Sequence, residues 1–461
     1  MTAFKTTVFF VALVGCVWGR PPAWAAQDPE PLTLAEAVEA ALRDNPEVAA
    51  VRHQRAAVES QAIQARSGLL PQLEVSEGYS RTDSPLWAFG TRLNQERIRA
   101  EDFAPERLND PEAIDNFNSA LALNWSLFDG GRTLIGWRQA QKAGEAAALD
   151  VLRSEQQIIA RTAAAYMGVL LAAQNRDVVA QSLATAQAHL KVVEDRFRGG
   201  LVVKSDLLRA RVRIAELAQQ QLQAESQVQV AEAMLKAMMG RADDRSLNPV
   251  TRPQGGTAPE ALQSWIVRAL AQRPELQRSK IQESIAQRAV DRAGAGHWPT
   301  LGLTGKYEFN SEDFPGEDAE SYTVGAVASL NLYSGQRISA ETAEAKALLA
   351  AVRSQAQGLA LNVRVEVQRA FLQAQSAWKS IEVAAAAVSQ AEEGLRIVAN
   401  RYEGGLLTIV SLLDAQVAFQ QARTRHFKAL HDYQVARVEL LLAAGVIDPQ
   451  SLESPQAMKL P

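Results

Sequence analysis

The side chains that most often carry chemistry are scarce in this sequence. It contains five histidines, which are His53, His189, His297, His426 and His431. Only His426 and His431 lie close together in the sequence, and a spacing of five residues poorly suits two groups that must share one face of a helix. We therefore expect exposed histidines on helices, with no active site, no metal site and no cofactor.

Three further observations restrict the function. Gly199 and Gly200 lack the flanking strand and the lysine of a phosphate-binding loop. The single cysteine, Cys16, excludes a disulfide and a thiolate metal site. The formal net charge of -4 over 461 residues provides no basic face for nucleic acid. These features predict a protein that is not an enzyme and does not bind nucleic acid, and whose stability comes from packing and assembly.

The N-terminus predicts export. Lys5 precedes an apolar run from Val8 to Trp18, and breakers and the small residues Ala23 and Ala25 follow. This order is typical of a secretory signal peptide covering residues 1–25. Alternatively, residues 13–16 resemble a lipobox, so that a lipoprotein signal would cover residues 1–15 and Cys16 would carry lipid. Both alternatives lead to the cell envelope, and the run is too short for a stable membrane anchor.

Similar segments recur in the same order through the two halves of the chain. Residues 45–48 match 273–276, residues 127–130 match 332–335, and residues 196–201 match 401–406. The offset falls from 228 to 205 between these markers, which places the difference in a longer loop of the first half. We expect that loop at about 81–116, exposed and without regular elements, and a short equivalent at 310–320. The predicted organisation is a first repeat at 32–248, a second repeat at 258–445 and a flexible C-terminal tail at 446–461.

Each repeat is expected to contain a long helical hairpin. No proline occurs in residues 112–248 or 316–448, which favours helix over most of both stretches. Apolar residues at alternating spacings of three and four predict a coiled-coil seam in each half. The two seams are Leu183, Ala186, Leu190, Val193 and Phe197, and Val388, Ala391, Leu395, Val398 and Tyr402. A helix from about Thr133 to Phe197 would be on the order of 100 Å long.

The pattern changes to a period of two in four short segments, which predicts strands. The segments are 72–80, 118–128, 299–309 and 321–333. A soluble sheet with its apolar face on a core would explain the alternation, and so would a membrane-spanning sheet. Four strands cannot close a barrel in a membrane, because the smallest single-chain barrels have about eight, so the strands would be pooled between chains. The fold class is therefore α+β, mainly α, and internally duplicated.

From Leu32 to Gly445 the chain resembles the TolC-like outer-membrane efflux protein family. The most specific evidence is Arg401 to Gly405 followed by Thr408 to Ala415, with a partner in Arg196 to Leu201 followed by Ser205 to Ala210. The resemblance implies a homotrimer whose helical hairpins form a periplasmic α-barrel. It also implies that three chains share a twelve-stranded transmembrane β-barrel.

The same resemblance gives the two glycine-containing segments a role as periplasmic turns that dock an adaptor protein. The implied docking residues are Arg196, Gly199, Gly200, Leu201, Ser205, Arg401, Gly404, Gly405, Leu406 and Thr408. Paired glycines suit a turn that needs positive φ after a helix. Ser205 or Ser411 is expected to cap the helix that follows.

The family closes its periplasmic tip with a Tyr, an Arg and Asp residues near these turns. Here Tyr402, Asp206 and Asp414 match that pattern, whereas Leu407 replaces the Arg and Ser411 replaces the first of two Asp residues. We therefore expect a gate formed by Asp206, Tyr402, Ser411 and Asp414, narrowest at Asp414 and with fewer charge pairs than the family pattern.

The implied function is a passive outer-membrane exit channel of a tripartite efflux or type I secretion system. Its partners would be a periplasmic adaptor, an inner-membrane transporter of the RND, ABC or MFS type, and outer-membrane lipid. Two alternatives stay open, a coiled-coil structural protein of the envelope and a periplasmic adaptor without a conduit. The sequence does not identify the exported substrate.

Overall fold

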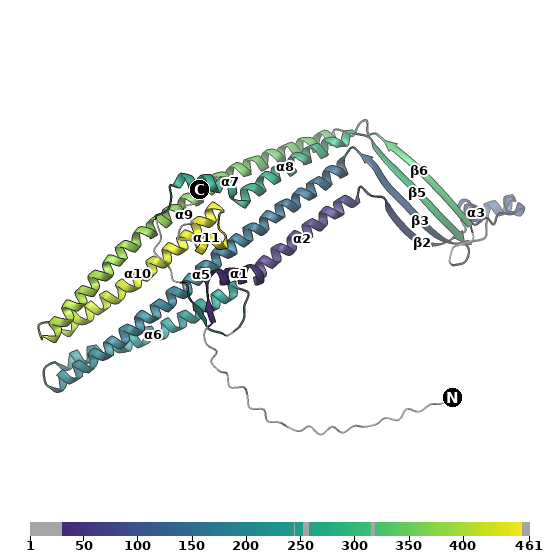
Figure 1. The fold of residues 1–461 in the computed structure, drawn as a ribbon. Coiled ribbons are helices and arrows are strands. Elements are labelled where there is room, and N and C mark those ends of the chain that lie inside the picture. The colour runs from purple at the N-terminus through teal and green to yellow at the C-terminus, as the bar shows by residue number, and fades with distance from the viewer. Residues whose placement is uncertain (1–29, 244, 252–257, 315–318, 454–461) are drawn as a thin grey trace, which may run out of the picture.

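The computed structural model describes residues 30–243, 245–251, 258–314 and 319–453, and the predicted signal peptide lies outside them. The molecule is elongated, with helical hairpins at one end and a sheet at the other (Figure 1). Apart from the short helices within residues 85–109, the helices of the first half are α1 (Leu34–Asp44), α2 (Pro46–Ser67), α5 (Arg132–Arg198) and α6 (Lys204–Met238). Those of the second half are α7 (Leu262–Gln272), α8 (Pro274–Gly294), α9 (Arg337–Glu403), α10 (Ile409–Ala444) and α11 (Pro449–Glu453).

The predicted long helices are confirmed. Helices α5 and α9 each contain 67 residues, which corresponds to about 100 Å. Helix α5 packs on α6, and α9 packs on α10, so each half forms a long hairpin (Figure 1). Helix α2 packs on α5, whereas α8 packs on both α5 and α9. Among the described residues, no helix has the length and apolar character needed to cross a membrane.

The four predicted strands form one antiparallel sheet in the order β2-β3-β5-β6. Their bounds are β2 Gln72–Thr82, β3 Ile114–Asp129, β5 Thr300–Ser311 and β6 Ala319–Ser329. The predicted end of the last strand at Tyr333 is wrong by four residues. Ser329 pairs with Thr300, the first residue of β5, so the chain beyond Ser329 has no partner strand.

The prediction that residues 81–116 carry no regular elements is also wrong. This connection between β2 and β3 contains the helices α3 (Pro85–Asn94) and α4 (Pro105–Asn109) and the 3-10 turn η1 (Ala100–Phe103). A proline at the first or second position of α3 and of α4 starts each helix, since proline suits the first helical turn. The sequence pattern missed these helices because each is too short to show a helical period.

The main core lies where the middle of the long hairpins meets the short elements. Strands β1 (Glu30–Leu32) and β4 (Leu247–Pro249) pair in parallel beside α5. Tyr166 of α5 is fully buried, donates a hydrogen bond to the Leu32 carbonyl (2.8 Å) and accepts one from the Thr251 amide (3.0 Å). The Tyr166 side chain therefore joins the segments that contain Leu32 and Thr251, which lie far apart in the sequence.

The C-terminal segment is part of this core, so the predicted flexible tail is wrong for residues 446–453. Ile447 and Leu452 are 3% and 8% exposed and belong to the main apolar cluster. Helix α11 packs on α1, and Ser451 and Asp448 bond to one another's backbone amides. Burial of two large aliphatic side chains stabilises this docking. Residues 454–461 lie outside the described part of the chain.

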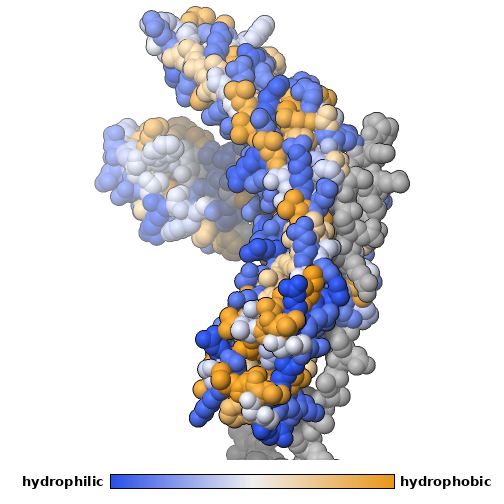
Figure 2. Space-filling view, turned by 90° about the vertical axis from the view of Figure 1, so that its left-hand side faces the viewer, coloured by the Kyte–Doolittle hydropathy of each residue, from blue (hydrophilic) through white to orange (hydrophobic). Residues whose placement is uncertain are grey.

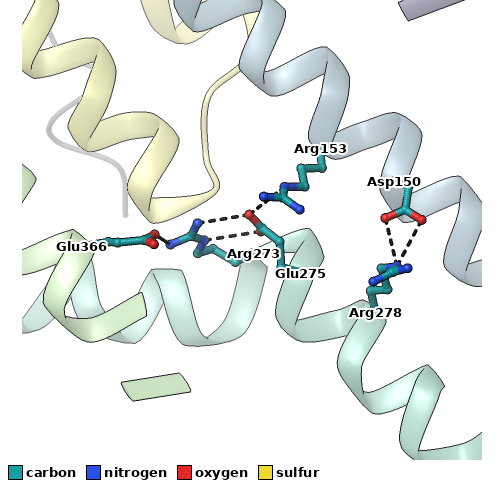
Figure 3. Close-up of polar contacts among 6 residues, drawn as sticks. All are labelled: Asp150, Arg153, Arg273, Glu275, Arg278 and Glu366. Atoms are coloured by element: carbon teal, nitrogen blue, oxygen red, sulfur yellow. Dashed lines mark hydrogen bonds and ion pairs between the residues drawn. The ribbon is translucent and has the colours of Figure 1, made fainter. Parts of the chain in front are cut away.

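Charged side chains join α8 to the helices on both sides of it (Figure 3). Arg273 contacts Glu366 of α9 and, at 3.1 Å, Glu275 of α8. Arg153 of α5 reaches Glu275 at 3.2 Å. Arg278 of α8 pairs with Asp150 of α5 at 2.9 Å. Burial opposes ionisation of Glu275, but the hydrogen bonds to this carboxyl and the charges of Arg273 and Arg153 together outweigh burial and lower its pKa.

Candidate functional site

The two hairpin turns have the same backbone geometry. Gly200 and Gly405 have φ of 74° and 75°, the left-handed region that favours glycine. The amides of Leu201 and Leu406 bond to the carbonyls of Arg196 and Arg401, each at 2.9 Å. This hydrogen bond, together with the one donated by the amide of Gly200 or Gly405, defines a Schellman C-cap in each turn. The predicted need for positive φ is confirmed at the second glycine of each pair.

The predicted serine caps are wrong. Helix α6 begins at Lys204 with Val203 as its N-cap, and α10 begins at Ile409 with Thr408 as its N-cap, both without a side-chain cap bond. Ser205 and Ser411 therefore lie within the first helical turn. The N-caps lie two residues before Ser205 and three residues before Ser411, so both helices start before the serines are reached.

The two turns are held side by side by an apolar cluster and one arginine. Val193, Leu207, Tyr402, Ile409 and Leu412 form the buried cluster, which draws on both hairpins. Arg196 at the end of α5 donates hydrogen bonds to the carbonyls of Tyr402 (3.1 Å) and Glu403 (2.9 Å) at the end of α9. Its guanidinium also lies 5.0 Å from the centroid of the Tyr402 ring, a cation–π distance.

Tyr402 is the one predicted gate residue at the centre of this cluster. Its side chain is 4% exposed, and its hydroxyl is buried with no hydrogen-bond partner among the described residues. Burial raises the pKa of Tyr402, and the nearby Asp206 carboxylate acts in the same direction, while Arg196 opposes them. Leu207, the residue after Asp206, belongs to the same buried cluster as Tyr402, so Asp206 lies next to that cluster without a hydrogen bond to the Tyr402 side chain among those of the described residues.

The other gate residues are not joined to Tyr402. Ser411 is half-buried, and its hydroxyl lies 3.4 Å from that of Thr408. Asp414 is exposed on α10. Within the described part of the chain, neither Asp206 nor Asp414 forms an ion pair. Three of the four predicted gate residues thus contribute no side-chain contact that closes the tip of a single chain.

Sequence reasoning missed the role of Arg196 as the bridge between the two turns. Arg196 was predicted as a docking residue, but its hydrogen bonds go to backbone carbonyls of the other hairpin. Backbone acceptors have no signature in the sequence. Phe197 corrects the seam prediction, because it is 38% exposed while Tyr402, its equivalent in the second repeat, is buried.

Around the turns, several apolar side chains remain exposed. Figure 2, which views the molecule from the hairpin end, shows hydrophobic surface broken up by hydrophilic residues there. Leu201 and Leu406 follow the two glycine pairs and are each 77% exposed. Val203 and Leu208 are 63% and 50% exposed. Exposed leucines at equivalent positions of both repeats make this end a candidate binding surface.

The sheet has one apolar and one polar face. On the apolar face, Val75, Leu121, Tyr307 and Tyr322 lie in one row across all four strands, and each is 38% or more exposed. The opposite face carries small and polar residues. Among them are Asn118, Ala120, Ala122, Asn124, Thr304, Lys306 and Thr323. The pair Glu77 and Ser119 interrupts the apolar face. The exposed apolar side chains around this pair favour an apolar environment outside the chain.

The histidines form no group. His53 and His297 are exposed, as expected, whereas His189, His426 and His431 are half-buried. Burial lowers the pKa of His189, although Glu403 opposes this. Among the described residues, no three His, Cys, Asp or Glu side chains are arranged to hold a metal ion.

Comparison with known proteins agrees with this geometry. The profile of the family described as "Outer membrane efflux protein" matches residues 37–241 and 265–446. The chain is 23% identical to outer membrane protein TolC of Vibrio cholerae over 91% of this chain and 92% of the relative. It is 26% identical to the alkaline protease secretion protein AprF of Pseudomonas aeruginosa, over 93% and 87% of the two chains.

A solved structure shows the same fold. The CmeC outer membrane channel of Campylobacter jejuni superposes with a TM-score of 0.73 at 19% identity, over 91% of this chain and 88% of that one. The two matched stretches of the family profile correspond to the two repeats and together cover most of the chain. The chain therefore belongs to the outer membrane efflux protein family.

Proposed function

We propose that this protein is the outer-membrane channel of an efflux or type I secretion system and catalyses no reaction. The observation that carries the proposal is a sheet with one exposed apolar face that continues directly into helical hairpins about 100 Å long. From Phe117 to Trp125, two aromatic residues on the apolar face of β3, the strand rises about 26 Å. Because barrel strands are tilted by about 40°, this length corresponds to about 20 Å along the membrane normal, close to the apolar band of about 25 Å in outer-membrane barrels, which aromatic residues flank on both sides.

Three chains would complete the structure. In one chain, β2 and β6 are edge strands, so each has a row of backbone groups with no partner among the described strands. Such edges are costly in hydrocarbon. Pairing of β6 with β2 of the next chain in a trimer removes both edges and yields a closed barrel of twelve strands. The polar face of the sheet would then line the conduit.

The assembly can be tested directly. We expect heat-resistant trimers in the outer-membrane fraction that conduct ions in planar bilayers. A soluble monomer would contradict the proposal and favour an envelope fibre or an adaptor. An outer-membrane trimer that does not conduct would favour a structural role over a channel.

The exposed leucines at the two turns support docking of a periplasmic adaptor at this end. The relatives AprF and PrtF are named as protease secretion proteins, and OpmQ is named for pyoverdine export. An inner-membrane transporter of the RND, ABC or MFS type would complete the system. Replacing Leu201 and Leu406 by Ser should reduce co-purification of the adaptor, while Leu222→Ser on α6, also exposed, should not.

Asp414 is proposed to line the narrowest point of the closed tip, with one copy from each chain. Asp414→Ala should raise single-channel conductance and reduce preference for cations, because three carboxylates leave the constriction. Glu392→Ala is the matched control, since it removes an exposed carboxylate from α9 away from the turn. Unchanged conductance and selectivity in Asp414→Ala would remove Asp414 from the gate.

A further inference from the structure

The connection between β2 and β3 is a small folded unit at the end of the sheet that is remote from the long hairpins (Figure 1). Asp102 is 5% exposed, pairs with Arg92 at 2.6 Å and accepts a hydrogen bond from the Arg99 amide at 2.8 Å. The hydrogen bond from the Arg99 amide, together with the neighbouring guanidinium groups, lowers the pKa of the Asp102 carboxyl. Phe89 and Phe103 make an edge contact with centroids 5.7 Å apart. These contacts hold the unit, residues 83–113, in one conformation.

The unit covers the polar face of the sheet. Gln95, at the end of α3, is 2% exposed and donates hydrogen bonds to the Asp115 carbonyl (2.8 Å) and the Asn116 side chain (2.9 Å). The side chains of Asn116 and Asn118 in turn bond to the Asn310 side chain, each at 3.0 Å. Asn118 and Asn310 are register partners and belong to the polar face. A network of amides thus fastens the unit to that face.

Burial at this end differs between the two faces. On the polar face, Ile114, Asn310 and Ala319 are 6%, 3% and 3% exposed. On the apolar face at the same end, Tyr79 remains 59% exposed, although Ser311 at the last position of β5 is 1% exposed. The hydrogen bonds of Gln95 and the burial of the three polar-face residues therefore place the unit over the side that would line the conduit.

Four large apolar side chains of the unit are exposed in one chain, and the two most exposed of them, Leu86 and Trp87, are neighbours. Leu86 and Trp87, in the first turn of α3, are 76% and 69% exposed. Lipid would meet the apolar face of the sheet, on the other side. In a trimer, the groups within reach of a unit that leans over the polar face are the same units of the other two chains.

We propose that residues 83–113 of the three chains constrict the outer mouth of the conduit, with Leu86 and Trp87 of neighbouring copies in contact. This inference rests on the proposed function, because it requires the polar face to line a shared conduit. The constriction would come from the first repeat alone, since only residues 312–318 connect β5 and β6 in the second. Apolar side chains at such a point narrow the conduit and restrict its hydration.

The test must report on the outer mouth and not on the periplasmic tip, which also limits conductance. Asn124→Cys places a thiol on the polar face, at the end of β3 remote from the mouth, where Asn124 pairs with Gln72 and Thr304. The natural sequence has one cysteine, Cys16, within the predicted signal segment or its lipidated site. The rate of labelling from outside intact cells is measured with a small charged methanethiosulfonate and with a maleimide on a polyethylene glycol chain.

A shortened variant removes the unit. Thr82 and Ile114 are register partners, so a two-residue Asn-Gly turn can replace residues 83–113 without changing the register. We expect the small reagent to label Asn124→Cys in both backgrounds. We expect the polymer reagent to label it on the order of tenfold faster in the shortened variant, because the pore diameter sets access.

The outcomes separate the two proposals. Equal polymer labelling in both backgrounds would overturn the constriction while leaving the channel in place. Failure of the small reagent in both, with heat-resistant trimers present, would show that the polar face is not an aqueous conduit, and both proposals would fail. Leu123→Cys, on the apolar face, should resist the charged reagent in both backgrounds.

A second variant guards against misfolding of the shortened chain. Leu86→Ser with Trp87→Ser leaves the buried contacts of Asp102 and Gln95 intact, since both replaced side chains are exposed. It should also speed polymer labelling of Asn124→Cys, to a smaller extent. Leu222→Ser, on α6 and also exposed, lies far from the outer mouth, so it is the control and should have no effect.

Discussion

At the scale of single residues, the contacts of Arg273 and Glu275 determine how α8 is held between the two long helices. The Arg273 and Glu275 side chains are 12% and 15% exposed. Pairs as little exposed as this one depend on mutual compensation, because removal of one partner leaves the other charge poorly solvated. Glu275 has a second partner in Arg153 of α5, so it connects α5, α8 and, through Arg273, α9.

Glu275 should contribute to the pH dependence of stability. Its pKa is lowered from 4.5 in the folded chain, so its contribution is present above the ordinary value and is lost as the pH falls through the lowered folded value. Glu275→Gln should cost about 1–2 kcal/mol at neutral pH and weaken the loss of stability on acidification. Thermal unfolding of the protein in detergent, followed by circular dichroism from neutral to acidic pH, measures this.

Glu59→Gln is the control, since Glu59 is half exposed and pairs with Arg55 within α2. Exposed pairs of this kind contribute about 0.5 kcal/mol or less. If acid reduced the stability of Glu275→Gln as steeply as that of the natural protein, Glu275 would not contribute to the pH dependence of stability.

At the scale of elements, the turns of the two hairpins depend on backbone conformation more than on side-chain contacts. In each turn the first glycine has ordinary helical φ, −79° at Gly199 and −74° at Gly404. The second glycine has positive φ and open space where a Cβ would stand. Positive φ therefore accounts for the second glycine of each pair, and the space around it does not.

This difference predicts unequal effects of alanine at neighbouring positions. Gly200→Ala should destabilise the turn by about 1 kcal/mol, because alanine is strained in the left-handed region. Gly199→Ala should have little effect or stabilise slightly, since its Cβ would meet atoms no closer than 3.6 Å. Hydrogen exchange of the Leu201 amide, which bonds to Arg196, should accelerate only in Gly200→Ala. Equal acceleration in the two variants would argue against conformational strain.

At the scale of the whole molecule, the two repeats place α2 and α8 on long helices in the same manner but with different charges. In the first repeat, Glu47 of α2 pairs with Arg161 of α5 at 2.7 Å. In the second, Glu366 occupies the position that corresponds to Arg161, and Arg273 occupies that of Asn45. Arg273 lies between Glu275 and Glu366, so a change of sign at one position is compensated by a new arginine at another.

A charge exchange tests this compensation. Glu366→Arg alone should destabilise the folded protein by about 1–3 kcal/mol, because it places a like charge beside Arg273 and removes a partner. Addition of Arg273→Asn should recover most of the loss. The double variant reproduces the first repeat, where Asn45 caps α2 by accepting a hydrogen bond from the Glu47 amide at 2.8 Å. Thermal unfolding of the single and double variants measures the coupling.

Additive losses in the double variant would show that the two positions do not interact. Arg52 and Glu155 pair at 2.7 Å in the first repeat. Exchange of the charges of these two residues provides a reference for an exposed pair. We expect a weaker coupling there.

The sequence by itself determined the duplicated plan of this protein. Helical spacing, absence of proline and alternation of apolar residues are local properties, so the bounds of α5, the presence of a long helix in the second repeat and the four strands, to within four residues at their ends, could be predicted. The positive φ at Gly200 and Gly405 is local too, since it arises within each turn.

Only the tertiary structure decided which equivalent residues are buried and which segments meet. Tyr402 is buried while Phe197 is exposed, although their positions in the two repeats correspond. Arg196 reaches carbonyls of the other hairpin, Gln95 fastens its unit to the polar face, and Leu452 docks the C-terminal helix. These contacts join segments far apart in the chain, and no spacing within either segment encodes them.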